Sequence, residues 1–402
     1  MKITNVRLRR LEGVLNYPGT FFEERRRHPT DIYGRFKAKP AETVSGVESL
    51  GDGRYRVIRT FVQIDTDEGV SGMAGPIVGD HAPSFYIDTQ LKPLLIGQDP
   101  LAHELLWDQM YRNAVNGRKG DNMIAISYID IALWDIKGKW LGQPVYRLLG
   151  GPVQERIPVY ASASGYSLDP EKVTERVRNF VKQGYYGTKW FVREGPTDGP
   201  EGVRKNVELV KAIREAAGPD MGIMIDAWNG WDIPYTLKMA ELLQEYGLSW
   251  IEEPVLPDLS QSYARLRAKC PVAIAGGEHE CTRWGFKMLM EMGAMDIYQP
   301  DPVWAGGISE VNKICILASA YDVKAILHGA VIPVSAQVSF AHNAVVTPMV
   351  EYLPVRNEAT QLFYKNPLKP VNGFITPPMT SGCGLDIDET KIVAEKDIRW
   401  TS

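Results

Sequence analysis

The chain contains little cysteine, only 4 residues among 402, and no two of them form a C-x-x-C pair. This spacing argues against a zinc cage and against a disulfide framework. Free thiols are typical of a reducing compartment, so we expect a cytoplasmic protein. The four positions are Cys270, Cys281, Cys315 and Cys383.

A long apolar run is also missing. The longest apolar-rich stretch, residues 123–136, is too short and too polar to cross a membrane. The first residues carry charges throughout and have no apolar core, so we expect no signal peptide. The polar residues that interrupt the stretch are Ser127, Tyr128, Asp130 and Asp135.

No charge of one sign dominates. The 45 basic and 49 acidic residues give a net charge of -4, and the longest basic run is Arg25-Arg26-Arg27. A run this short is typical of a solvated surface, so we expect no nucleic-acid partner. The length of 402 residues favours one large domain with a smaller one beside it.

The N-terminal part has the pattern of a small α+β domain, which we place at residues 1–125. Apolar residues alternate along residues 56–76, and Asp67-Glu68-Gly69 supplies a hairpin turn. Residues 84–118 have helical spacing. The tail, residues 356–402, is rich in proline and glycine, and we expect it to return to this domain.

Residues 126–355 repeat a strand followed by a helix. Successive strands start 23 to 34 residues apart, close to the roughly 30 residues that one unit of an eight-stranded (β/α) barrel needs. Only seven helices fall between the strands, and the helix over residues 122–142 precedes them. The expected strands are 157–161, 187–192, 221–226, 248–253, 272–278, 295–301, 323–328 and 349–353.

Three consecutive strands of this barrel end in a carboxylate. Asp226, Glu252 and Glu278 follow each other at intervals of 26 residues, and the carboxyl ends of barrel strands meet at one rim. Three such charges repel each other unless a cation neutralises them, and Mg²⁺ prefers oxygen ligands of this kind. The alternative is that each acid is a solvated residue at the end of a strand.

The next two strands end in Asp301 and His328, which are 27 residues apart. A carboxylate that accepts one imidazole N–H fixes the tautomer and makes the ring a better base. The pair therefore predicts a general base beside the carboxylates. A satisfied core histidine is the alternative.

Two further ionisable residues fall on barrel strands. Lys189 lies on the second strand, with Phe191 on the same face, and Glu351 lies on the eighth. Lys189 is a candidate to neutralise a substrate carboxylate, and Glu351 is a candidate catalytic acid. Either residue is equally consistent with a charge in the barrel core or at its rim.

These features resemble the mandelate racemase subgroup of the enolase superfamily. The resemblance rests on IDIALWDIKGKWLGQPVYRLLGG (129–151), on the carboxylate series and on the Asp301–His328 pair. It implies a capping domain over a modified (β/α)7β barrel of the TIM type. It also implies Mg²⁺ on Asp226, Glu252 and Glu278, and His328 as the base that removes a proton alpha to a carboxylate.

One position departs from the racemases of this family. They carry a K-x-K pair on the second strand, whose second lysine is a base on the opposite face, and here that position is Phe191. A single histidine can instead remove the alpha proton and then assist loss of the β-hydroxyl. Residues 189–199 and 277–286 resemble rhamnonate dehydratases and their near relatives, which implies dehydration of an aldonate such as L-rhamnonate to a 2-keto-3-deoxy acid.

The resemblance also implies that the capping domain contacts the substrate. We expect the loop over residues 25–39 to close over the barrel, with His28, Arg54 and Arg59 as candidate ligands for hydroxyls or the carboxylate. Plain surface charge is the alternative for each of them. Barrels of this type commonly associate, so we expect a homo-oligomer.

Three other functions stay open at this point. A racemase, epimerase or cycloisomerase on the same scaffold is one, with Glu351 as an acid, although Phe191 argues against it. A non-catalytic binding protein would need neither the carboxylate series nor His328. A barrel unrelated to this family is the third alternative, and it does not explain five ionisable residues at consecutive strand ends.

Overall fold

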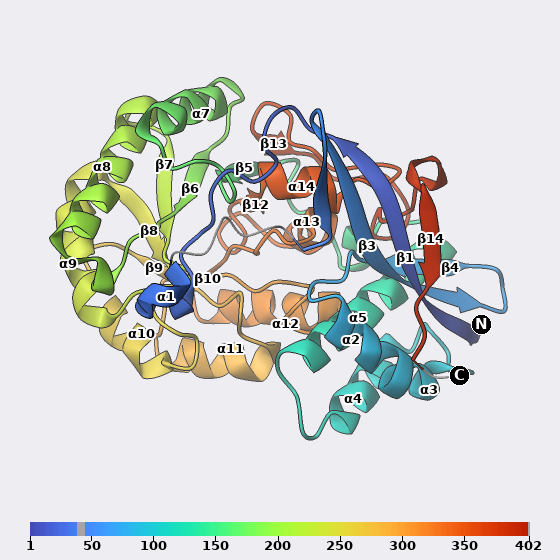
Figure 1. Cartoon of the computed structure of the whole chain (residues 1–402). Helices are drawn as coiled ribbons and strands as arrows, with labels where there is room; N and C mark the ends of the chain where they lie inside the picture. The colour runs from blue at the N-terminus through green and yellow to red at the C-terminus, as the bar shows by residue number, and fades with distance from the viewer. Residues whose placement is uncertain (38–44, 401–402) are drawn as a thin grey trace.

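The computed structural model describes residues 1–37 and 45–400, and these form two sheets (Figure 1). One sheet is antiparallel and contains the N-terminal strands. The other is parallel, curls into a barrel and is wrapped by helices. No helix of the described residues is long and apolar enough to cross a membrane.

The antiparallel sheet has the order β14-β1-β3-β2, with β4 paired to β3. Its long central pair is apolar on alternate residues, because one face packs on helices and the other does not. The predicted hairpin is confirmed, since β3 pairs with β4 across the turn at residues 67–69. The strands are β1 (Ile3–Asn16), β2 (Val47–Gly51), β3 (Arg54–Thr66), β4 (Ser71–Ala74) and β14 (Ala394–Asp397).

The end of the chain returns to this sheet, because β14 pairs antiparallel with β1. Both termini therefore lie on the same side of the molecule (Figure 1). Arg9 of β1 reinforces the pairing, with its Nε 2.7 Å from Glu395 Oε1 and its Nη2 3.0 Å from Glu389 Oε2.

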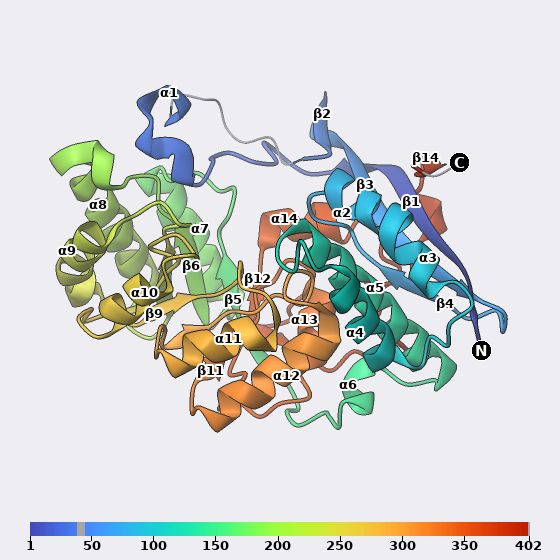
Figure 2. The same ribbon diagram turned by 90° about the horizontal axis from the view of Figure 1, so that it is seen from below.

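Helices cover the inner face of the antiparallel sheet (Figure 2). They are α2 (His81–Tyr86), a π-helical turn (Ile87–Leu91), α3 (Lys92–Leu95), α4 (His103–Asn113) and α5 (Asp121–Trp140). Helix α5 is buried on nearly all sides, as its apolar composition on every face requires. It contacts both β4 and the barrel helix α12 (Gly307–Ala320).

The parallel sheet has the order β11-β10-β9-β8-β7-β6-β5-β12, and β13 (Phe374–Ile375) adds to β5. The predicted fold class, a modified (β/α)7β barrel with an N-terminal α+β capping domain, is confirmed. The eight strands are β5 (Ile157–Ser162), β6 (Gly187–Phe191), β7 (Gly222–Asp226), β8 (Leu248–Glu252), β9 (Ile274–Gly276), β10 (Ile297–Tyr298), β11 (Lys324–Ala325) and β12 (Val350–Tyr352).

Within the described residues, seven helices alternate with these strands. The N-cap of the first is Asp169, which accepts from two backbone amides, and Pro170 follows at the first helical position, as predicted. Besides α12, the alternating helices are α7 (Pro170–Lys182), α8 (Gly199–Ala217), α9 (Ile233–Leu243), α10 (Ser260–Arg267), α11 (Thr282–Glu291) and α13 (Ile332–Ser339). Short helices are α1 (Gly34–Lys37), α6 (Val145–Leu148) and α14 (Pro354–Thr360).

Strands β9, β10 and β11 are shorter than the sequence predicted. Glu278, Asp301 and His328 follow them in the connecting segments instead of ending them. Backbone bonds between neighbouring segments nevertheless continue past the strand ends, for example from His328 N to Pro300 O at 3.2 Å. These bonds keep the three side chains at the barrel rim.

The predicted boundary between residues 125 and 126 falls inside α5, which packs on the antiparallel sheet and on the barrel helix α12. We retain the division into 1–125, 126–355 and 356–402 as a proposal. Unfolding experiments that show whether these three parts unfold separately would test this division.

Asp135 of α5 ties three distant segments together. Its fully buried carboxylate accepts from Met73 N of β4 at 2.8 Å and from Cys383 N of the tail at 2.7 Å. Lys139 Nζ lies 2.7 Å from the same carboxylate and 2.6 Å from Asp386. The antiparallel sheet, helix α5 and the C-terminal tail are thus joined by one buried carboxylate.

Replacing Asp135 with alanine should lower the free energy of unfolding by about 3–5 kcal/mol, because two buried amides and Lys139 lose their partner. Urea unfolding followed by tryptophan fluorescence measures this change. The matched control is Asp108→Ala, whose exposed pair with Arg112 should contribute no more than about 1 kcal/mol. Equal effects from the two variants would contradict the role given to Asp135.

Candidate active site

The side chains at the carboxyl end of the barrel strands converge, and all of them are buried. Asp226 ends β7 and Glu252 ends β8, so the parallel register places them side by side as direct partners. Glu278, Asp301 and His328 follow the next three strands. The residues predicted from the sequence therefore share one rim, as barrel geometry requires.

Lys189 lies among these carboxylates. Its Nζ forms an ion pair with Glu252, and it is 3.3 Å from Asp226 Oδ2 and 2.9 Å from Glu351 Oε1. Burial lowers the pKa of a lysine, but Glu252 and Glu351 outweigh burial, so the pKa of Lys189 lies well above its usual value. Lys189 is thus a permanent cation that is already shared by three acids.

Two neutral side chains fix the other oxygen of Glu252. Trp250 Nε1 donates to Glu252 Oε2 at 3.0 Å, and Gln299 Nε2 donates to the same oxygen at 2.7 Å. The sequence reasoning did not find either donor. Residues two apart on a strand point to the same face. Trp250 stands two residues before Glu252, and Gln299 stands two residues before Asp301, so this spacing was the signal that could have found them.

His328 and Asp301 form a close pair. His328 Nδ1 lies 2.5 Å from Asp301 Oδ2, and Val303 N donates to the other Asp301 oxygen at 2.7 Å. The ring of Trp304 stacks on the imidazole, with the ring centres 4.9 Å apart. With Nδ1 directed at Asp301, Nε2 of the ring faces the acidic cluster.

The surroundings of His328 Nε2 are acidic. Glu278 Oε2 is 3.4 Å away and Glu351 Oε2 is 3.8 Å away. Burial opposes a charge on the ring, but the carboxylates, led by Glu278, raise the pKa of His328 to about 10.

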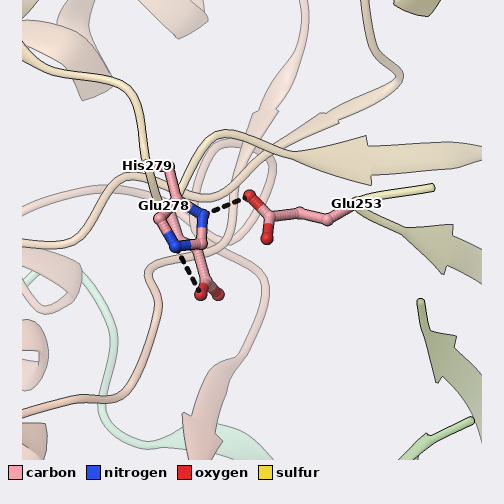
Figure 3. Close-up of side chains that lie close together, drawn as sticks. All are labelled: Glu253, Glu278 and His279. Atoms are coloured by element: carbon pink, nitrogen blue, oxygen red, sulfur yellow. Dashed lines mark hydrogen bonds and ion pairs between the residues drawn. The ribbon is translucent and has the colours of Figure 1, made fainter. Parts of the chain in front are cut away.

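A second histidine bridges two acids beside this site (Figure 3). His279 Nδ1 is 2.8 Å from Glu253 Oε1, and its Nε2 is 3.8 Å from Glu278 Oε1. Asn229 Nδ2 donates to the remaining Glu253 oxygen at 3.0 Å. The sequence reasoning gave neither Glu253 nor His279 a role, although each directly follows a residue of the carboxylate series.

Buried acids outnumber buried cations at this rim. Burial, followed by repulsion from Glu252, raises the pKa of Asp226 well above its usual value. A divalent cation that prefers oxygen ligands fits such an excess of carboxylates. Among the described residues of the rim, the acids are Asp226, Glu252, Glu253, Glu278, Asp301 and Glu351, against Lys189 and two imidazoles.

The loop over the barrel reaches this site, and residues 25–37 of the predicted 25–39 fall within the described part of the chain. The ring centre of His28 is 5.2 Å from that of Trp228, whose backbone N donates to Asp226 Oδ1 at 2.8 Å. Figure 2 shows α1, at the end of this loop, on the barrel side and apart from the antiparallel sheet.

The two arginines predicted to contact the substrate, Arg54 and Arg59, lie in different surroundings. Arg54 is exposed at the start of β3. Arg59 Nη1 donates to Ser45 O at 2.8 Å, in the turn before β2, and to Ile58 O at 2.9 Å, in β3. The contacts described for Arg59 thus do not include the carboxylate rim.

The sequence matches known families over most of its length. Residues 47–150 match the mandelate racemase / muconate lactonizing enzyme N-terminal domain, and residues 172–391 match the enolase C-terminal domain-like family. The chain belongs to the enolase superfamily, in its mandelate racemase subgroup.

Relatives and solved structures of the subgroup align along the chain. An L-rhamnonate dehydratase of Saccharopolyspora erythraea is 34% identical over 337 residues, 81% of this chain and 82% of the relative. The rhamnonate dehydratase of Gibberella zeae complexed with Mg has a TM-score of 0.79 at 31% identity, over 97% of this chain and 95% of that chain. The 3,6-anhydro-D-galactonate cycloisomerase of Zobellia galactanivorans has a TM-score of 0.76 at 30% identity, over 97% and 98%.

Replacing Lys189 with methionine should lower the free energy of unfolding by about 3–5 kcal/mol, because three buried carboxylates lose their shared cation. Urea unfolding in metal-free buffer measures the change. Lys287→Met is the control, since the ion pair of Lys287 with Glu291 is exposed and should contribute at most about 1 kcal/mol. A Lys189→Met protein as stable as the control would show that the carboxylates do not depend on this cation.

Proposed function

We propose that the chain is a Mg²⁺-dependent hydro-lyase that dehydrates an acid sugar of the L-rhamnonate type to a 2-keto-3-deoxy acid. One observation carries this proposal. The His328–Asp301 pair faces the carboxylate rim, and Phe191 stands at the sequence position where the racemases of this family carry a second lysine. A site with one proton carrier suits elimination and not inversion.

In the first step, His328 Nε2 removes the proton from C2, beside the substrate carboxylate. The electron pair of that C–H bond passes into the carboxylate and gives an enediolate. Asp301 holds the Nδ1–H, so the ring keeps the tautomer that accepts at Nε2 and is stabilised once it becomes charged. The stacked Trp304 limits rotation of the ring.

In the second step, the enediolate expels the hydroxyl at C3, and protonated His328 supplies the proton that lets it leave as water. The histidine returns to its neutral form, so no net proton is gained or lost. The enol that remains tautomerises to the 2-keto-3-deoxy acid. Since one ring performs both transfers, the proton and the hydroxyl depart from the same face.

We assign Asp226, Glu252 and Glu278 as the residues that hold Mg²⁺. When bound, the ion would supply positive charge that offsets the charge gained by the substrate carboxylate and counters the carboxylates that raise the pKa of His328, so that the ring is neutral when it takes the proton. Trp250 and Gln299 keep Glu252 in a fixed orientation. The rhamnonate dehydratase of Gibberella zeae complexed with Mg supports Mg²⁺ as the ion.

The dehydratase relatives support the substrate class, and the cycloisomerase of Zobellia galactanivorans favours one second candidate. On a 3,6-anhydro acid sugar, the same proton removal would expel the ring ether oxygen at C3 in place of a hydroxyl. The leaving oxygen would then stay on the product, and the ring would open without release of water.

Purified protein with Mg²⁺ should convert at least one of a panel of aldonic acids, including L-rhamnonate, L-lyxonate and L-mannonate, to a 2-keto-3-deoxy acid. His328→Asn should lower kcat/KM about 10²–10⁴-fold, because general acid–base catalysis is lost. The exposed His81→Asn variant should keep wild-type rates. A colorimetric assay for 2-keto-3-deoxy acids measures both.

The same reaction run in D₂O should place solvent deuterium at C3 of the product, and no C2 epimer of the substrate should accumulate. Accumulation of the epimer would reveal a second proton carrier and would overturn the single-base mechanism. Near-normal turnover by His328→Asn would remove His328 from the role of base.

Chelation should abolish turnover, and added Mg²⁺ should restore it. Without substrate, Mg²⁺ at about 100 times its Kd should stabilise the fold by about 2.7 kcal/mol, because only the folded chain brings the ligands together. Asp226→Asn should lose this stabilisation, and the exposed Asp258→Asn should retain it. Thermal unfolding with and without Mg²⁺ measures the difference, and equal Mg²⁺ responses would contradict the ligand assignment.

A further inference from the structure

Helix α5 carries a polar stripe on the side that faces α12, and the two helices lie side by side (Figure 1). Ser127, Asp130 and Trp134 make up this stripe. They are three and four residues apart, so they share one face of the helix, and all three are buried. The contacts described for them do not include the carboxylate rim, so the proton transfers at His328 leave the stripe without a role.

Asp130 holds the first turn of α12. Ser309 N donates to Asp130 Oδ2 at 2.9 Å, and Ser309 Oγ donates to Asp130 Oδ1 at 2.6 Å. Trp134 Nε1 donates to the same hydroxyl oxygen at 2.9 Å, which leaves the hydroxyl proton for Asp130. The first backbone amides of a helix have no partner within it, and Gly306 at the N-cap has no side chain to accept from them. Asp130 therefore caps α12 from a neighbouring helix.

The turn that precedes α12 is fastened to the same layer of helices. Gly306 N donates to Ser127 Oγ at 2.9 Å, and Gly306 O accepts from Trp107 Nε1 of α4 at 2.8 Å. Gly307 has a φ of +84°, and a Cβ at this position would overlap the carboxylate of Asp130. The carboxylate thus approaches the turn as closely as a residue without a side chain permits.

This turn, residues 301–306, also carries the groups that orient the base. Trp304 N donates to Asp301 O at 3.0 Å, and Val303 N donates to Asp301 Oδ1 at 2.7 Å. The other oxygen of Asp301 contacts His328 Nδ1, and Trp304 stacks on the imidazole. The backbone that α5 fastens therefore sets the position of both side chains that hold the ring of His328.

We propose that Asp130 is a positioning residue for the His328–Asp301 pair. It acts through Ser309 and the turn over residues 301–306, which it holds at a fixed place against α5. This inference rests on the proposed function. Proton transfer requires the base and the C2–H bond to be aligned, and a displacement of about 1 Å can cost about 100-fold in rate. Helix α5 is a rigid support for this purpose, because Asp135 joins it to β4 and to the tail.

The first test compares Asp130→Asn with Asp135→Asn. Asp135 is the matched control, since its carboxylate is equally buried on the same helix but accepts from Met73 N and Cys383 N and not from α12. Asp130→Asn should lower kcat for the acid sugar about 10- to 100-fold and change KM less than about twofold, because the amide accepts one bond where the carboxylate accepts two. Asp135→Asn should keep both constants.

Both constants are measured at a temperature at which each variant is folded. Ser309→Ala is the second variant if Asp130→Asn fails to fold, and it should lower kcat about 3- to 30-fold, since it removes the hydroxyl bond and leaves the backbone amide. An unchanged kcat in these variants, or an equal loss of kcat in Asp135→Asn, would overturn the inference.

The second test is a double-mutant cycle, which separates positioning from a general loss of folded protein. Asp301→Asn alone should lower kcat, because the base loses its partner. Asp130→Asn added to Asp301→Asn should then lower kcat by no more than about threefold, since its main effect passes through Asp301. Fully additive losses would show that Asp130 acts independently of the pair and would overturn the positioning role.

The third test needs no turnover. In protein with ¹⁵N-labelled histidine and Mg²⁺, the two ring nitrogens of His328 are identified among the 6 histidines by the loss of their signals in His328→Asn. Asp130→Asn should shift these two signals, because the contact of Nδ1 with Asp301 changes. Asp135→Asn should leave them in place. Signals of His328 that stay unmoved in Asp130→Asn would contradict the inference.

Two failures can be told apart. If the wild type dehydrates the acid sugar while Asp130→Asn keeps its kcat, the inference on Asp130 is overturned and the proposed function stands. If the wild type dehydrates no acid sugar of the panel, the proposed function is overturned, and the inference falls with it.

Discussion

Excess negative charge buried at one end of the barrel is the constraint on which the rest of the structure depends. An unpaired buried carboxylate is destabilised by several kcal/mol, so each acid needs a partner. Lys189 forms ion pairs with Asp226, Glu252 and Glu351. His279 pairs with Glu253, and His328 pairs with Asp301. The same arrangement that keeps the acids folded holds them in position for a divalent cation and an anionic substrate.

The capping domain completes the site through packing as much as through charge. The loop over residues 25–37 lies against the barrel because Arg27 occupies a slot between two glycines and meets Asp198 there. This contact brings His28 and Arg26 over Trp228, next to the carboxylate rim. Substrate selection can thus vary in the loop while the acids and the His328–Asp301 pair stay on rigid strands.

The fold was predictable because its signal repeats. Eight apolar segments at near-constant intervals indicate a (β/α) barrel even where each segment is ambiguous alone, and all eight expected strands are present. The strand ends were less predictable: β9, β10 and β11 stop before Glu278, Asp301 and His328, since segments can keep single bonds to a neighbour after regular pairing has ended.

The sequence by itself determined the barrel, the carboxylate series and the Asp301–His328 pair, because each lies at the same point of a repeating local unit. Only the tertiary structure decided that Lys189 is shared by three acids, that Trp250 and Gln299 orient Glu252, and that Arg59 donates to carbonyls of the capping domain. It also brought Arg26 onto Trp228. The contacts of Lys189, of Gln299 and of Arg26 join residues far apart in the chain, and no local pattern encodes which loop packs against which strand end.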